Sequence, residues 1–137
     1  MSGAVAPPIT VGALLAVAVG GAAGASLRWG LGEVVPEGSG FPWTTLGINV
    51  LGSFLLALLP ALALLRDRRA PTLALGPGLL GGFTTLSAYA DQSRALVADG
   101  QSLLAAGYVS LTATGCVLAV LAGHRLAGSW APEEVDL

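Results

Sequence analysis

Hydrophobic residues fill four long stretches of the chain, and each stretch is close to the length that crosses a membrane. The stretches run from about 11 to 29, 43 to 65, 72 to 97 and 103 to 126. A bilayer core takes about 20 apolar residues in helical form, and a spanning helix satisfies its own backbone polar groups. The pattern predicts an all-α integral membrane protein, with residues 1–137 forming a single domain of four transmembrane helices.

The third stretch differs from the others in its content of helix-breaking residues. Five of the seven residues from 76 to 82 are glycine or proline, and a continuous helix pays about 1 kcal/mol for each glycine and about 3 for a proline. Hydroxyl residues follow at once, in the run Gly81-Gly82-Phe83-Thr84-Thr85-Leu86-Ser87-Ala88-Tyr89. Polar groups at membrane depth must be satisfied by protein, water or an ion. We therefore expect the third helix to be broken near the bilayer centre, beside a permeation path.

Composition supports the membrane prediction. The chain is 54% hydrophobic and 10% charged, with a mean hydropathy of +0.78, whereas soluble domains are about 25% charged. It contains no lysine and no basic run, so nucleic acid is not an expected partner. The single Cys116 excludes an internal disulfide. No charged side chain precedes the first stretch, so we expect that stretch to stay in the mature protein rather than to act as a signal peptide.

Polar residues recur at helical spacing in two of the stretches. In the second, Thr45, Asn49 and Ser53 lie four residues apart, and Tyr108, Thr112 and Cys116 repeat this spacing in the fourth. Residues four apart share one face of a helix. Each stripe has two interpretations: hydrogen bonding between helices, which is common in membrane bundles, or one wall of a narrow wet track.

Charged residues bear on orientation and on chemistry. With four crossings both termini share a side, and the arginines on that side are Arg66, Arg68, Arg69 and Arg125, against Arg28 and Arg94 on the other. This bias favours cytoplasmic termini.

The pattern contains no His, Cys and carboxylate cluster typical of a transition-metal site. Ser87 has neither His nor Lys within plausible reach in the sequence, so we do not expect an enzyme.

Three motifs, taken together, resemble the Fluc (CrcB) family of fluoride channels. They are a glycine-rich segment that ends in Arg28, Gly20-Gly21-Ala22-Ala23-Gly24-Ala25-Ser26-Leu27-Arg28, the segment Thr45-Leu46-Gly47-Ile48-Asn49-Val50-Leu51-Gly52-Ser53-Phe54, and the third-stretch run given above. The resemblance implies a multi-pass protein of the plasma (inner) membrane that exports fluoride passively to lower its cytoplasmic concentration. It also implies a small antiparallel dimer of dual-topology type, with two pores and a central structural Na⁺ that is not transported.

The resemblance also assigns residues. It implies that the backbone carbonyls of Gly81 and Thr84 hold the Na⁺, and that Arg28 is a channel-entrance or structural residue. The fluoride pathway would include Asn49, Thr45, Ser53, Leu86, Ser87, Tyr89, Tyr108 and Thr112.

This chain departs from the family pattern at three positions. Leu86 and Tyr89 stand where the family has a pair of phenylalanines, whose electropositive ring edges face the anion, and Gln92 stands where it has a glutamate. Tyrosine offers either its ring edge or its hydroxyl. The departures suggest a second hypothesis, in which the chain is one half of a heterodimer with an inverted homologous subunit that supplies the aromatic pair.

Two other classes of membrane protein compete with a channel. A small four-span, proton-coupled multidrug exporter of cations needs a carboxylate within the membrane, and here Glu33 lies beyond the end of the first stretch and Asp91 at an exposed edge. The third class is a non-conducting assembly subunit, in which the hydroxyl stripes only join helices.

Overall fold

The computed structural model of the chain describes residues 10–38, 40–62 and 68–129, and these residues form helices without strands. The elements are α1 (Val11–Val34), α2 (Trp43–Leu58), the 3₁₀ turn η1 (Leu59–Ala61), α3 (Arg69–Leu73), the π-helical η3 (Ala74–Leu80), α4 (Gly81–Phe83), α5 (Leu86–Ala98) and α6 (Ser102–Ser129). Three helices, α1, α2 with η1, and α6, are long and apolar enough to cross a membrane. At this level, the prediction of an all-α membrane protein is confirmed.

The third predicted stretch is a series of short elements. Helix runs from Arg69 to Phe83 through the π-helical η3, which contains Pro77. Thr84 (φ −73°, ψ 157°) and Thr85 (φ −147°, ψ 117°) then adopt extended backbone before α5 begins. The Thr85 hydroxyl accepts a hydrogen bond from the Ala88 N–H and so caps α5.

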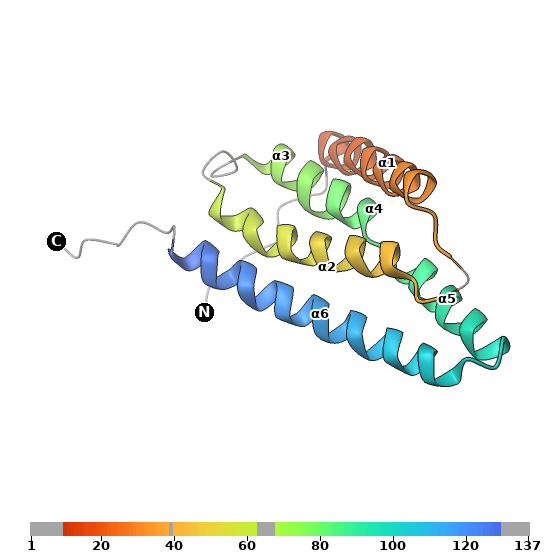
Figure 1. Ribbon diagram of the computed structural model, residues 1–137. Helices are drawn as coiled ribbons and strands as arrows, with labels where there is room; N and C mark the ends of the chain where they lie inside the picture. Colours follow the sequence, from red (N-terminus) through yellow and green to blue (C-terminus); the bar gives the residue numbers. More distant parts are fainter. Residues whose placement is uncertain (1–9, 39, 63–67, 130–137) are drawn as a thin grey trace, which may run out of the picture.

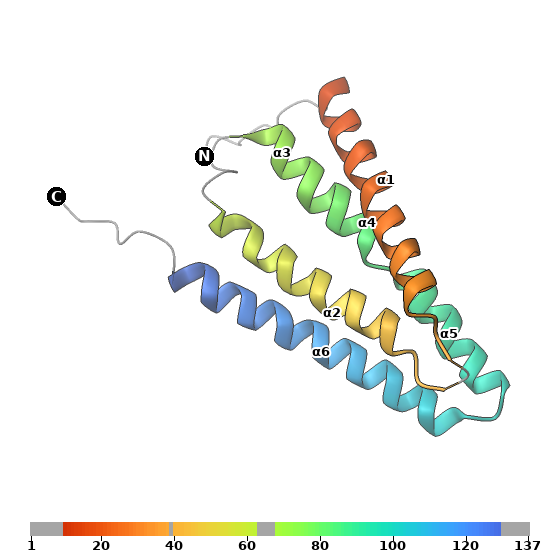
Figure 2. The same cartoon turned by 45° about the horizontal axis from the view of Figure 1, so that its top comes forward.

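The helices lie in two antiparallel sets (Figure 1). α2 and α6 run side by side in one direction, whereas α1 and the series α3 to α5 run in the other. α1 packs against η3 and α4, and α5 continues past the break to pack on the first half of α6 (Figure 2).

Glycines set the distance between α1 and the η3 segment. A Cβ atom on Gly20 would collide with the carbonyl of Ala74, and one on Gly24 with the carbonyl of Leu79 and, at 2.8 Å, with the nitrogen of Phe83. The backbones therefore touch directly, which is the close approach that small residues allow in membrane helices.

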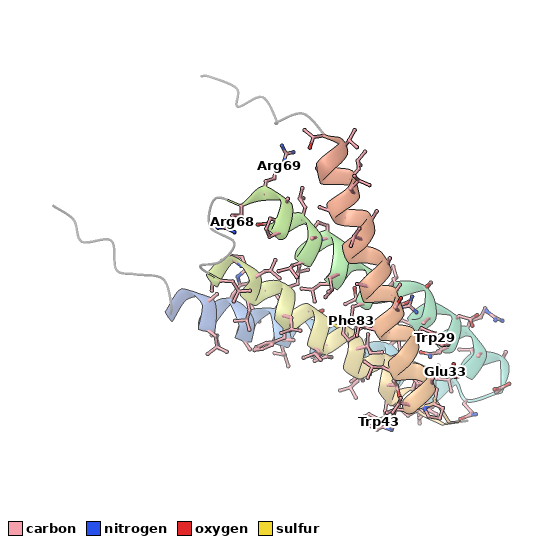
Figure 3. All side chains as sticks on the ribbon, turned by 90° about the horizontal axis from the view of Figure 1, so that it is seen from above. Trp29, Glu33, Trp43, Arg68, Arg69 and Phe83 are labelled. Carbon is pink, nitrogen blue, oxygen red and sulfur yellow. The ribbon has the colours of Figure 1, made fainter. Side chains whose placement is uncertain are left out.

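The observed helix ends correct several predicted boundaries. α1 continues past Trp29 to Val34, because no proline interrupts it before Pro36, and Glu33 therefore belongs to the helix rather than to the connecting loop. α6 is longer than predicted at both ends, and the predicted end of the second stretch, 63–65, lies outside the described residues. Figure 3 places Trp29, Glu33 and Trp43 at one end of the bundle, and Arg68 and Arg69 at the other.

Candidate functional site

The helix break is held by the side-chain amide of Asn49. Its Oδ1 accepts a hydrogen bond from the Thr85 N–H at 2.8 Å, and its Nδ2 donates one to the Thr85 carbonyl at 3.0 Å. Both residues are buried, with 8% of each exposed. The amide therefore gives the Thr85 N–H an acceptor in place of its helical partner, donates to the Thr85 carbonyl, and joins α2 to the break.

The same arrangement releases two backbone carbonyls. In a continuous α-helix the N–H of Thr85 would bond to the Gly81 carbonyl, and the N–H of Ala88 to the Thr84 carbonyl. Here the first N–H goes to Asn49 and the second to the hydroxyl of Thr85. Gly81 and Thr84, the two positions expected to hold Na⁺, thus lose the donors that a continuous helix would give their carbonyl oxygens.

The two polar stripes meet in a hollow of about 360 Å³ between α2, α6 and the break. Its polar lining comes from Asn49, Ser53, Thr84, Thr85, Thr112 and Cys116. Thr112 is only 4% exposed, and within the described residues its Oγ1 has no hydrogen-bond partner. A buried hydroxyl without a partner loses its hydration for no return, and here it belongs to a residue that lines the hollow.

A second hollow, of about 280 Å³, lies toward the end of the bundle that carries Trp29 and Glu33 (Figure 3). Its polar lining comes from Arg28, Glu33, Glu37, Thr44, Thr45 and Gln92. Thr85 lines both hollows, so the Asn49 and Thr85 pair lies between them. The α2 stripe therefore runs from the second hollow at Thr45 into the first at Asn49 and Ser53.

Three side chains from different helices form a hydrogen-bonded chain beside the second hollow. The Tyr108 hydroxyl of α6 donates to Gln92 Oε1 of α5 at 2.8 Å, and Gln92 Nε2 donates to the Thr45 hydroxyl of α2 at 2.9 Å. Tyr108 is fully buried and lines neither hollow. Sequence reasoning identified both hydroxyls, but treated Gln92 only as a substitution and missed its bridging role.

The residues around the start of α5 occupy different environments. Tyr89 lines the first hollow, its hydroxyl donates to the Val109 carbonyl of α6 at 3.2 Å, and its ring centroid lies 5.3 Å from that of Tyr108. Leu86 lines the same hollow but is 77% exposed. Ser87 lies outside both hollows, with its Oγ 3.2 Å from the Thr85 hydroxyl.

Arg28 contacts the end of the helix that precedes the break. Its Nε donates to the Gly82 carbonyl at 3.4 Å, and the side chain is partly buried. A helix C-terminus leaves carbonyls without partners and carries partial negative charge. The guanidinium gives one of these carbonyls a donor and places a positive charge at this helix end.

These features define a class of protein: a small α-helical membrane protein in which an interrupted helix and two polar stripes line two hollows that share Thr85. Helix breaks of this kind are tolerated at membrane depth where they line a cavity or bind ions, as in channels and transporters.

Comparison with known proteins narrows this class to one family. A family model described as CrcB-like protein, Camphor Resistance (CrcB), matches residues 15–124. A fluoride-specific ion channel FluC from Thermus thermophilus is 44% identical over 122 residues, which cover 84% of this chain and 94% of the relative. FluC proteins from Cereibacter sphaeroides and Chlorobaculum tepidum are 41% and 38% identical, and cover 88% and 85% of this chain and 98% and 95% of their own lengths. The chain belongs to the CrcB family, whose named relatives are ion channels rather than enzymes.

Proposed function

We propose that this chain forms a fluoride-specific channel that lets fluoride leave the cell passively across the plasma membrane. The relatives named above support this proposal, and the observation that carries it is the hollow where the α2 and α6 stripes meet, lined by Asn49, Ser53 and Thr112. Fluoride is small and strongly hydrated, so a selective path has to replace water with donors. The described lining of the hollow contains hydroxyl and amide side chains and no charged side chain.

In this proposal fluoride moves along the α2 stripe from the second hollow to the first. It passes Thr45 at the mouth, then Asn49, and then Ser53 and Thr112 in the deeper hollow. Tyr89 lines this hollow with its hydroxyl bonded to the Val109 carbonyl, and its ring would contribute an edge, which attracts an anion. Leu86 supplies no such edge. Ser87 and Tyr108 act from outside the hollows, by hydrogen bonding to Thr85 and Gln92.

We further propose that Gly81 and Thr84 hold a structural Na⁺ through their backbone carbonyls. The support is that both carbonyls are deprived of helical donors at the break, and hard cations take oxygen ligands. When bound, the ion would supply positive charge to these oxygens and fix the two helical segments. The chain's own contribution is Asn49 and Thr85, which divert the competing N–H groups.

The functional unit in this proposal is an antiparallel dimer in which α3 to α5 together make the third of four crossings. The exposed Leu86 beside the first hollow supports a second subunit over this face. The distribution of arginines along the bundle indicates how the chain is oriented in the membrane. Arg68 and Arg69 lie at the end opposite Glu33 (Figure 3), whereas Arg28 is hydrogen-bonded to the Gly82 carbonyl next to the break. This bias favours cytoplasmic termini, and a chain with one orientation needs an inverted homologous subunit.

Fluoride release from reconstituted vesicles, followed with a fluoride electrode, tests these proposals. We expect fluoride to leave while chloride is retained, and the double variant Leu86→Phe, Tyr89→Phe to be several-fold faster than the unmodified chain. Full activity of the unmodified chain would reject an obligate partner. Absence of fluoride release from both proteins, each reconstituted alone and together with an inverted homologous subunit, would overturn the channel proposal. Proton-driven cation transport would favour an exporter.

A further inference from the structure

α1 carries Arg28 onto the end of the helix that precedes the break. Gly20, Gly24 and Arg28 lie four residues apart, so they share one face of α1. The two glycines bring this face into direct backbone contact with η3 and α4, where a Cβ atom on Gly24 would lie 2.8 Å from the nitrogen of Phe83. The next turn of the same face then places the Arg28 Nε 3.4 Å from the Gly82 carbonyl oxygen.

The carbonyls at this helix end have different partners. The last carbonyls of a helix have no donor within it. The Leu80 carbonyl accepts from both the N–H and the hydroxyl of Thr84, each at 3.0 Å, and the Gly82 carbonyl accepts from Arg28. Between them, the Gly81 carbonyl has lost the N–H that a continuous helix would give it. The guanidinium therefore bonds to the carbonyl next in sequence to one that the proposed Na⁺ site uses.

The charge of Arg28 has no carboxylate bonded to it within the described residues. Glu33 and Glu37 line the same hollow as Arg28, but the ion pair recorded for the described part of the chain joins Arg94 to Asp91. The Glu37 carboxylate is bonded to backbone amides instead. A guanidinium stays charged in proteins, so this helix end carries a fixed positive charge before any cation binds.

We propose that Arg28 is a built-in positive charge at the break, which supports this helix end when Na⁺ is absent and weakens the binding of Na⁺ to the Gly81 and Thr84 carbonyls. The inference rests on the Na⁺ site of the proposed function. The partial negative charge of a helix C-terminus attracts both cations. Two positive charges that share one helix end also repel each other, and partial burial limits the screening of that repulsion. An arginine with a structural role alone would change stability but not the affinity for Na⁺.

The variant Arg28→Gln removes the charge and keeps a side-chain N–H donor. Thermal unfolding in micelles, followed by circular dichroism while NaCl replaces N-methyl-D-glucamine chloride at constant ionic strength, gives the apparent dissociation constant for Na⁺. We expect this constant to fall by about tenfold in Arg28→Gln, which corresponds to about 1.4 kcal/mol. Without Na⁺, the unfolding temperature of this variant should fall by about 4 °C, and the deficit should shrink as Na⁺ is added.

Two matched variants separate charge at the break from other effects. Arg28→Lys keeps the charge, so its dissociation constant for Na⁺ should stay within about twofold of that of the unmodified chain. Arg69→Gln removes an exposed arginine at the other end of the bundle (Figure 3) and should leave the constant unchanged, because salt screens a charge at that distance.

Equal dissociation constants in Arg28→Gln and the unmodified chain overturn the inference, whether or not vesicles release fluoride. An equal change in Arg28→Lys or Arg69→Gln also overturns it, because the effect would not come from charge at the break. If Arg28→Gln does not fold, Glu33→Gln tests the same electrostatics at an exposed residue of the hollow that Arg28 lines. Loss of that negative charge should raise the constant by about twofold, and no rise would overturn the inference.

Two further outcomes distinguish this inference from the proposed function. Lack of stabilisation by Na⁺ in every protein overturns both the inference and the proposed Na⁺ site. Tighter Na⁺ binding in Arg28→Gln, with no fluoride release from any of the proteins, supports the inference and counts against the channel proposal alone.

Discussion

Replacing Asn49 by alanine removes both hydrogen bonds that hold the peptide group of Thr85. Hydrogen bonds between membrane helices contribute about 0.6 kcal/mol on average, so the loss of two accounts for about 1.2 kcal/mol of stability. A buried donor or acceptor left without a partner costs about 1 to 3 kcal/mol. The adjoining hollow of about 360 Å³ is large enough to admit water to the stranded groups, which keeps the cost toward the low end. We expect a loss of about 2 kcal/mol in the free energy of unfolding.

Reversible unfolding in mixed detergent micelles, followed by circular dichroism, measures this loss. Ser53→Ala is the matched control: it lies one turn further along the same face of α2, lines the same hollow, and makes no hydrogen bond that the described structure records for its side chain. It should change stability by less than about 0.5 kcal/mol. Asn49→Asp keeps the acceptor for the Thr85 N–H but places an oxygen against the Thr85 carbonyl, so it should be at least as damaging as alanine. Equal stability of Asn49→Ala and Ser53→Ala would refute the reasoning.

Two further predictions concern packing and the buried hydrogen-bonded chain. Gly24→Ala should destabilise the fold by about 1 to 3 kcal/mol, because the added Cβ atom would collide with backbone atoms of Leu79 and Phe83. In the same unfolding assay Gly12→Ala should be neutral or slightly stabilising, because a Cβ atom there meets nothing within 4 Å. Tyr108→Phe should cost about 1 to 2 kcal/mol because it strands the amide oxygen of Gln92, and Tyr89→Phe should cost less because its bond is exposed. Equal losses within either pair would contradict the respective argument.

The parts of this molecule that sequence predicts well are those that depend on local pattern. The apolar stretches predicted helices because length and hydropathy are properties of neighbouring residues. The spacing of Thr45, Asn49 and Ser53 placed them on one face because a helix repeats every 3.6 residues. Small residues such as Gly20 and Gly24 permit a close approach between helices, although nothing in the local pattern identifies η3 as the neighbour.

The contacts that sequence did not predict join residues that are distant along the chain. The contact of Glu37 fits no local capping pattern, because the carboxylate lies seven and eight residues before the amides that it binds. Gln92 reaches Thr45 across 47 positions. The apolar stretch from 11 to 29 predicts α1 too short, because helical backbone continues through the charged Glu33 to Val34.

The two interpretations of the Asn49 stripe are compatible. A side-chain amide carries two donor hydrogens, and the Thr85 carbonyl takes one of them. Among the described residues, no acceptor is recorded for the second, and Asn49 lines the first hollow with Thr112, whose hydroxyl is unpartnered. The bonds to Thr85 fix the plane of the amide, so the remaining hydrogen has a fixed direction and costs no further side-chain entropy when it binds. In the proposed channel, joining the helices would therefore also orient Asn49 as a donor for fluoride, and a variant that breaks the bonds to Thr85 should impair both roles together.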